Sequence, residues 1–387
     1  MRTVNFTGNN HITLLQSGAQ FFPSLIAAID NARHEIFLET YIFTLDETGV
    51  RVKNALQKAA QRGVAVYVIV DWIGTGRVAC NLLRTEFAAT GVHFRRFNPW
   101  FLRGIARTHR KICVADREFA FVGGLNINDD LRSDRDPDVV LPAPRWDFAI
   151  LIRGTLVDSI YIEMTAQWTR LGHIRLKARW ENFRKIRAQK PPRSIEPARA
   201  GLVLRDNLRD RRTIERAYLK ALGRARKTAL LANPYFAPSR KLRRALEAAA
   251  QRGVEVTLLL GVGQLRLQDA IAHSYYPKLL QSGVRIVEYR KTELHAKVAV
   301  VDDLWATVGS SNYDGLSLFV NHEANVVVLD QEFARQLRLQ IEAAVADGVP
   351  IRLADFSNIV WYKRFWYGTA FILYRGAIRL MSWSLSD

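Results

Sequence analysis

The chain contains the stretch HRKICVAD at residues 109–116, followed by GGLN at 123–126. A second stretch has the same design, with HAKVAVVD at 295–302 followed by GSSN at 309–312. In both copies Lys follows His by two residues, Asp follows Lys by five, the first Gly follows Asp by seven, and Asn follows that Gly by three. One His-x-Lys triplet occurs by chance in many proteins, but two copies with the same tail indicate a shared function.

The sequence around these stretches is also duplicated. AAQRGV occurs at 59–64 and again at 249–254, which is an offset of 190, and the two motif histidines are 186 residues apart. A nearly constant offset is typical of an internal duplication. Strand-like apolar runs alternate with helical apolar spacing in both halves. The sequence therefore predicts an α/β protein in which each half is a mixed, largely parallel β-sheet flanked by helices.

The composition predicts a globular protein with an anionic partner. Of 387 residues, 49% are hydrophobic and 24% are charged, and the net charge is +19. Such a charge fits either membrane phospholipid or nucleic acid. The two cysteines, Cys80 and Cys113, form no disulfide framework, so we expect a reducing compartment. A run of about 18 apolar residues, as a membrane span requires, is missing from the sequence.

We predict four parts: a first lobe at 1–172, a basic linker at 173–200, a second lobe at 201–348 and an aromatic, basic C-terminal segment at 349–387. The linker is either a solvated connection or a contact for anionic lipid. If the C-terminal segment is helical, Arg364, Arg375 and Arg379 fall on one face. Aromatic residues with a basic stripe are typical of a segment in a membrane interface. The alternative is a helix packed on the body of the protein.

The repeated residues suit phosphodiester chemistry. Residues two apart in a strand share a face, so His109 and Lys111 point the same way, as do His295 and Lys297. We expect the two sets to meet in a site of approximate two-fold symmetry. There one imidazole attacks phosphorus and forms a phosphohistidine, while the other exchanges a proton with the alcohol. The lysines supply positive charge, so we expect neither a metal nor a cofactor.

Three further pairs of residues have predicted roles. Asn126 and Asn312 reach back from the glycine turns to hold phosphoryl oxygens with the lysines. Asp116 and Asp302 lie an odd number of residues after each His and are interpreted as supports outside the reaction centre. A carboxylate on the far imidazole nitrogen fixes the tautomer of a catalytic histidine. We propose Asp147 and Glu323 for this role, because each precedes an apolar strand-like run; the alternative is ordinary surface acids at strand ends.

The doubled pattern resembles the phospholipase D superfamily over residues 8–335. More narrowly, the chain is similar to bacterial cardiolipin synthases of the shorter type that lack N-terminal transmembrane helices. The stretches that carry this resemblance are IFLETYIF at 36–43, RDN at 205–207, ANPYF at 232–236, GSSNYD at 309–314 and NHEAN at 321–325.

The resemblance implies two duplicated lobes related by a pseudo-two-fold, with the active site at the seam between them. It implies transfer of a phosphatidyl group to phosphatidylglycerol, which makes cardiolipin, with phosphatidylethanolamine as another possible donor. It further implies His109 as nucleophile and His295 as general acid and base. We expect a monomer, because both half-sites are in one chain. We also expect it to lie peripherally on the cytoplasmic face of the bacterial cell membrane, bound to its anionic surface.

Two other functions compete with this interpretation. The first is a nuclease or phosphodiesterase of the same superfamily, since a charge of +19 suits DNA as well as lipid. The C-terminal aromatic segment argues against nucleic acid as the partner, because a nuclease has no need of it. The second is a membrane scaffold without catalysis, but a scaffold has no need of two complete motifs.

Overall fold

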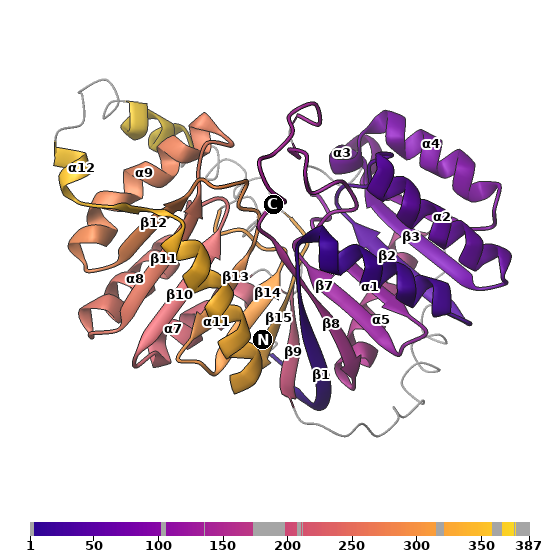
Figure 1. Ribbon diagram of the computed structural model, residues 1–387, viewed down its shortest axis with the longest axis horizontal. Coiled ribbons are helices and arrows are strands. Elements are labelled where there is room, and N and C mark those ends of the chain that lie inside the picture. Colours follow the sequence, from indigo (N-terminus) through magenta and orange to yellow (C-terminus); the bar gives the residue numbers. More distant parts are fainter. Residues whose placement is uncertain are drawn as a thin grey trace.

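The protein has two lobes that meet along a central seam (Figure 1). The structure is a computed structural model that describes residues 4–101, 106–134, 136–172, 198–206, 210, 212–314, 321–357, 366–374 and 376. The predicted basic linker lies outside the described residues except for 198–200, with which the second lobe begins. Arg364, Arg375 and Arg379 also lie outside them.

The two lobes repeat one order of elements. The first lobe comprises β1 (Thr7–Gln16), α1 (Ser17–Asn31), β2 (Glu35–Thr40), α2 (Glu47–Gln61), β3 (Ala65–Asp71), α3 (Trp72–Thr75), α4 (Arg77–Ala88), β4 (His93–Phe97), the 3-10 turn η1 (Pro99–Phe101), β6 (Ile112–Ala115), β7 (Phe119–Gly123), β8 (Phe148–Gly154) and α5 (Leu156–Leu171). The second comprises β9 (Ala198–Arg205), α7 (Thr213–Arg224), β10 (Thr228–Asn233), α8 (Arg240–Gln251), β11 (Glu255–Gly261), α9 (Arg266–Gln281), β12 (Arg285–Tyr289), β13 (Val298–Val301), β14 (Trp305–Gly309), β15 (Glu323–Leu329), α11 (Gln331–Ala346), β16 (Val349–Ile351) and α12 (Ala354–Ser357).

The duplicated AAQRGV stretch ends a helix and starts a buried strand in each lobe. Gly63 and Gly253 follow α2 and α8 with φ angles of 91° and 88°, a left-handed conformation that glycine adopts without steric cost. The amide of the next residue then bonds back to the last turn, from Val64 to Ala59 and from Val254 to Ala249, at 3.1 Å in both lobes. The repeated sequence therefore ends a helix in the same way in both lobes.

The strands form a single sheet that confirms the predicted duplication. Its order is β16-β12-β11-β10-β13-β14-β15-β9-β1-β8-β7-β6-β2-β3-β4. β1 and β9 lie at the centre and pair antiparallel, with Thr7 opposite Ala200 and Asn10 opposite Ala198. From there, equivalent strands run outward in the same order on both sides, so the lobes are related by a pseudo-two-fold.

The mixed sheet of the α/β prediction is confirmed, but the expected majority of parallel pairs is not observed. Parallel pairing joins β2 to β3, β3 to β4, β10 to β11 and β11 to β12. The strands nearer the centre pair antiparallel. The reason is that each motif folds as a tight hairpin, β6–β7 or β13–β14, which reverses the chain direction without a crossover helix.

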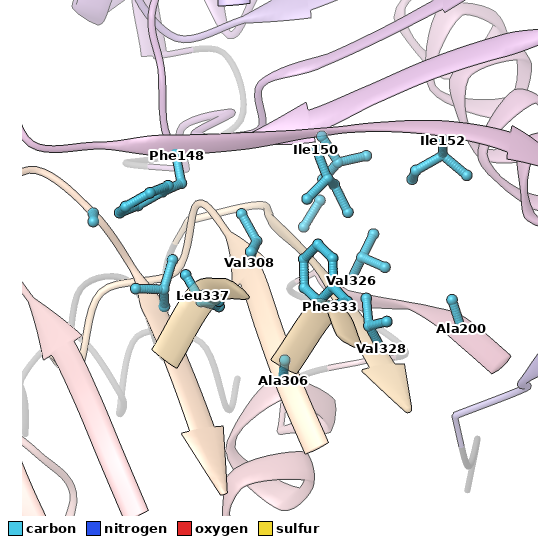
Figure 2. Packing of buried hydrophobic residues seen from close by; sticks show 14 of the residues in the cluster. Phe148, Ile150, Ile152, Ala200, Ala306, Val308, Val326, Val328, Phe333 and Leu337 are labelled. Atoms are coloured by element: carbon cyan, nitrogen blue, oxygen red, sulfur yellow. The ribbon is translucent and has the colours of Figure 1, made fainter. Parts of the chain in front are cut away.

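A shared hydrophobic core holds the lobes together at the seam. Phe148 and Ile150 on β8 face Val326 on β15 and Phe333 on α11 (Figure 2). Each of these side chains is at most 3% exposed. A core built from both lobes fixes their relative position, and this in turn fixes the distance between groups that face each other across the seam.

The C-terminal segment packs on the second lobe. Residues 349–351 form β16 on β12, and 366–374 are helical. In that helix Ala370 is fully buried and the Phe371 ring lies 5.4 Å from the Tyr275 ring on α9, whereas Ile372 and Leu373 are 69% and 62% exposed. Within the described part of the chain, a helix with the length and apolar character to cross a membrane does not occur.

Candidate active site

Both His-x-Lys triplets lie at the seam, immediately before a motif strand. β6 begins at Ile112 and β13 at Val298, so the expectation that the triplets are inside the strands is wrong: each lysine lies one residue, and each histidine three residues, before its strand. Each triplet instead pairs with the opposite lobe. The His109 amide donates to the His322 carbonyl at 2.9 Å, and the His295 amide donates to the Trp146 carbonyl at 3.0 Å. His322 and Trp146 directly precede Glu323 and Asp147.

This pairing brings each candidate acid to the histidine of the other lobe. His109 Nδ1 is 3.1 Å from Glu323 Oε2, and His295 Nδ1 is 2.5 Å from Asp147 Oδ2. The four side chains belong to residues that are at most 9% exposed. Because each Nδ1 is occupied by a carboxylate, Nε2 is the nitrogen of each ring that is left for chemistry.

The two lysines of the motif are buried beside the histidines. Lys111 Nζ donates to the His109 carbonyl at 2.9 Å, and Lys297 Nζ donates to the carbonyl of His295. Burial, together with Lys297, lowers the pKa of Lys111 to about 7. Burial lowers the pKa of Lys297 to about 8, although Asp147 and Glu323 act against it. The nearby carboxylates therefore offset the positive charge of the two ammonium groups only in part. This favours the binding of an anion between them.

Burial also keeps both imidazoles neutral. It lowers the pKa of His109 despite the opposing effect of Glu323. Burial and Lys297 together lower the pKa of His295 to about 3. Burial by itself raises the pKa of a carboxyl group, but Lys297 and His295 outweigh it at Asp147 and hold that pKa below its usual value. The pKa of Glu323 is likewise below its usual value, since His109 and Lys111 outweigh burial.

The two half-sites differ in how they hold the acid. Ser310 Oγ donates to Glu323 Oε2 at 2.5 Å, and the Ser310 carbonyl lies 3.0 Å from His109 Nδ1. The equivalent residue in the first lobe is Gly124. A Cβ at this position would lie 2.2 Å from Asp147 Oδ1, so a side chain does not fit here. The first motif therefore has Gly-Gly, which leaves room for Asp147. The second has Gly-Ser, whose serine bonds to Glu323.

The two asparagines of the motif are buried, at 3% and 5% exposure for Asn126 and Asn312. Asn126 Nδ2 donates to Asp134 Oδ2 at 3.2 Å. Asn312 Oδ1 is a buried acceptor without a hydrogen-bond partner within the described residues. The two asparagines thus differ, because Asn126 Oδ1 also accepts from the Ile42 amide at 3.4 Å, whereas the buried Asn312 oxygen still needs a donor.

Asp116 and Asp302 lie at the other end of the motif strands, in the turns after β6 and β13. Asp116 accepts hydrogen bonds from the amides of Arg33, His34 and Glu35 at 2.6, 2.8 and 2.8 Å. Asp302 accepts from Arg226, Lys227 and Thr228 at 2.8, 2.8 and 3.0 Å. Both tie the motif hairpin to the start of the neighbouring strand, and their role as supports outside the reaction stays a prediction.

Residues outside the repeated motifs brace the first His-x-Lys triplet. Asp71, at the end of β3, accepts from the Thr108 amide at 2.8 Å. Glu39 is fully buried and accepts from the Thr108 hydroxyl and from Gln167 Nε2, the latter at 3.2 Å. An acidic residue inside an apolar strand was the available signal for Glu39. These bonds make Glu39 a support of the triplet.

Sequence reasoning missed Asp134, which comes from the loop between β7 and β8. Its Oδ2 atom lies 3.8 Å from His295 Nε2. The sequence gives little indication of this residue, because the loop is longer than the equivalent segment between β14 and β15 and so falls outside the repeated pattern.

Solved structures with this fold include phosphatidylserine synthase from Haemophilus influenzae, with a TM-score of 0.71 and 16% identity, covering 98% of this chain and 96% of that one. Polyphosphate kinase from Porphyromonas gingivalis has a TM-score of 0.54 and 15% identity, covering 93% of this chain and 56% of that one. At these identities the similarity concerns the fold alone. The duplicated α/β lobes and the paired His-x-Lys half-sites fit the resemblance of both motifs to the phospholipase D superfamily.

A family model described as "Cardiolipin synthase, PLD-like domain" matches residues 25–144 and 218–345, one match for each lobe. Cardiolipin synthase B of Escherichia coli K12 is 37% identical over 345 residues, which cover 87% of this chain and 81% of that protein. Cardiolipin synthase 1 of Bacillus cereus is 29% identical over 362 residues, which cover 91% of this chain and 69% of that protein. The chain belongs to the cardiolipin synthase family of phosphatidyl transferases.

Proposed function

We propose that this enzyme makes cardiolipin by passing a phosphatidyl group to a hydroxyl of phosphatidylglycerol through a phosphohistidine. The observation that carries the proposal is the pair of cross-lobe contacts, His109–Glu323 at 3.1 Å and His295–Asp147 at 2.5 Å, with two buried lysines beside them. Two oriented imidazoles and two cations are what an in-line exchange at phosphorus needs.

In the first half-reaction His109 Nε2 attacks phosphorus, and the bond from phosphorus to the leaving alcohol oxygen breaks. His295 gives a proton to that oxygen. In the second half-reaction His295 takes the proton from a hydroxyl of phosphatidylglycerol, whose oxygen attacks phosphorus and breaks the bond to His109. Lys111 and Lys297 offset the charge on the phosphoryl oxygens, so the proposal needs no metal ion or other cofactor.

The assignment of His109 as nucleophile is supported by the surroundings of the other histidine. The Asp134 carboxylate lies 3.8 Å from His295 Nε2. A carboxylate there opposes the approach of a phosphodiester but stabilises an imidazolium, so it suits an acid and base. The bound phosphodiester adds further negative charge and would raise the low pKa of His295 toward the range in which it can carry a proton.

We further propose that the protein acts as a monomer on the cytoplasmic face of the bacterial membrane. A net charge of +19 supports binding to anionic lipid. The exposed apolar side chains of Trp366, Ile372 and Leu373, at 45%, 69% and 62% exposure, support contact of the C-terminal helix with the membrane interface. Binding to vesicles with and without anionic lipid tests the membrane contact. Sedimentation of the free protein tests the monomeric state.

The decisive test uses vesicles that contain phosphatidylglycerol alone, phosphatidylethanolamine alone, or both, with the products identified by mass spectrometry. We expect cardiolipin wherever phosphatidylglycerol is present, and the mixture reports which lipid donates. His109→Ala and His295→Ala should abolish the product, and full activity of either variant would contradict the mechanism. Efficient cleavage of single-stranded DNA without lipid transfer would favour the nuclease alternative.

A further inference from the structure

The loop at residues 129–145 crosses the seam. Arg132 and Val140 form an antiparallel bridge, so the loop folds back as a hairpin. Two residues of the loop contact the other lobe: Ser133 Oγ donates to Glu293 Oε1 at 2.5 Å, and the Ala143 carbonyl accepts from Thr292 Oγ1 at 2.6 Å. The first lobe thus sends a loop across the site that is longer than the equivalent segment between β14 and β15 of the second lobe.

This loop holds the Asp134 carboxylate in a fixed position. Asn128 Nδ2 donates to Asp134 Oδ1 at 2.5 Å, and the guanidinium of Arg145 forms an ion pair with the same oxygen. Arg145 is 5% exposed and also donates to Asn128 Oδ1 at 2.8 Å. A carboxylate whose charge is offset by a buried arginine can face a phosphodiester site with less repulsion than a free one.

The other oxygen, Oδ2, points to the reaction centre. It accepts from Asn126 Nδ2 at 3.2 Å and lies 3.8 Å from His295 Nε2. The latter distance is too long for a direct hydrogen bond. In the proposed reaction His295 Nε2 exchanges protons with the alcohol, so the Asp134 carboxylate lies beside the reacting nitrogen. Its Oδ2 atom can accept a further hydrogen bond there.

We infer that Asp134 is a specificity-determining residue, which accepts a hydrogen bond from a second hydroxyl of the acceptor while His295 engages the reacting one. This rests on the proposed function. Adjacent hydroxyls, as in a glycerol headgroup, satisfy both groups at once. Water and alcohols with one hydroxyl leave the side of the carboxylate that faces His295 without a donor, and because the Asp134 side chain is only 15% exposed, this loss penalises the wrong substrate. Asp134 therefore favours transfer to glycerol-type acceptors over hydrolysis.

The test compares glycerol with ethanol as soluble acceptors, added together to phosphatidylethanolamine vesicles. Products are phosphatidylglycerol, phosphatidylethanol and phosphatidic acid, and their ratio is measured in one preparation, so it does not depend on how much enzyme is folded. For Asp134→Ala we expect the preference for glycerol over ethanol to fall roughly tenfold and the share of phosphatidic acid to rise. Asp134→Asn, which keeps the shape but removes the charge, should lose part of the preference.

The matched control is Asp138→Asn, which removes the same charge from an exposed position of the same hairpin and should leave the ratio as in the wild type. An unchanged ratio in Asp134→Ala, with transfer to both alcohols reduced equally, would mean that Asp134 only braces the loop and would overturn the inference. An equal gain with both alcohols would mean that the carboxylate obstructs the site, and would also overturn it. Wild-type enzyme that forms no phosphatidyl alcohol from these vesicles and also no cardiolipin from vesicles of phosphatidylglycerol would contradict the proposed function itself.

Discussion

Glu323 of the second lobe binds the imidazole of His109 in the first, with Oε2 3.1 Å from Nδ1, and Asp147 of the first lobe binds His295 of the second in the same way. Neither lobe contains a complete histidine and acid pair. The seam core is therefore a functional requirement, because a small shift between the lobes would separate both histidines from their acids at once.

We expect Glu323→Gln to lower the rate of phosphohistidine formation by about 100-fold or more. The amide of Gln can donate to Nδ1, and the imidazole proton then resides on Nε2, where it blocks attack on phosphorus. Rapid acid quenching with labelled lipid measures the phosphoenzyme directly. Glu332→Gln, an exposed change at the start of α11, is the control. A variant with wild-type phosphoenzyme formation would show that Glu323 does not orient the nucleophile.

Gly124→Ala should damage the enzyme more than Ser310→Ala, although the two positions are equivalent in the repeat. The new Cβ at 124 would lie 2.2 Å from Asp147 Oδ1 and would push this carboxylate off His295. Ser310→Ala removes one hydrogen bond to Glu323 but leaves the Ser310 backbone carbonyl on His109. We expect losses in turnover of roughly 100-fold and roughly tenfold, respectively. Equal losses would contradict this difference between the half-sites.

Asp116→Ala should reduce stability without reducing the turnover of the folded enzyme. The carboxylate accepts three backbone hydrogen bonds at 2.6 to 2.8 Å, and all three donors lose this partner in the variant. We expect the free energy of unfolding to fall by about 2–4 kcal/mol in urea titrations. Glu118→Ala, an exposed change in the same turn, should have little effect. Loss of turnover in fully folded Asp116→Ala would place this residue in the reaction.

The repeated spacing was sufficient to predict the duplicated lobes and a site where His109, His295 and their lysines meet. It was not sufficient to predict which acid binds which histidine, since this depends on how the lobes pack at the seam. Pattern reasoning also could not find Asp134. The site was predicted from residues that occur in both halves, and Asp134 lies in a loop that differs between the two lobes. Glu39 stands out in the sequence as an acidic residue inside an apolar strand, but its role follows only from its contact with Thr108 in the folded protein.

Lys111 provides a test of the site's electrostatics that does not depend on lipid turnover. Burial and Lys297 lower its pKa from 10.5 to about 7 in the folded protein. Between pH 7 and about 10 the unfolded chain therefore holds a proton at this lysine that the folded protein has released. Stability rises with pH wherever the unfolded state binds more protons, so Lys111 contributes a rise of up to about 1.4 kcal/mol per pH unit in this window.

Lys111→Met lacks this group, so its free energy of unfolding should exceed that of the wild type most clearly at pH 7, where the folded protein still pays part of the cost of a buried charge. The difference should shrink as the pH rises toward 9, because the wild type gains stability and the variant does not gain this contribution. Urea titrations at pH 7, 8 and 9 measure it, with the exposed change Lys241→Met as control. A difference that stays constant over this range would mean that the pKa of Lys111 is not lowered by burial, and that the pair of lysines is not the poorly compensated anion site inferred from their contacts.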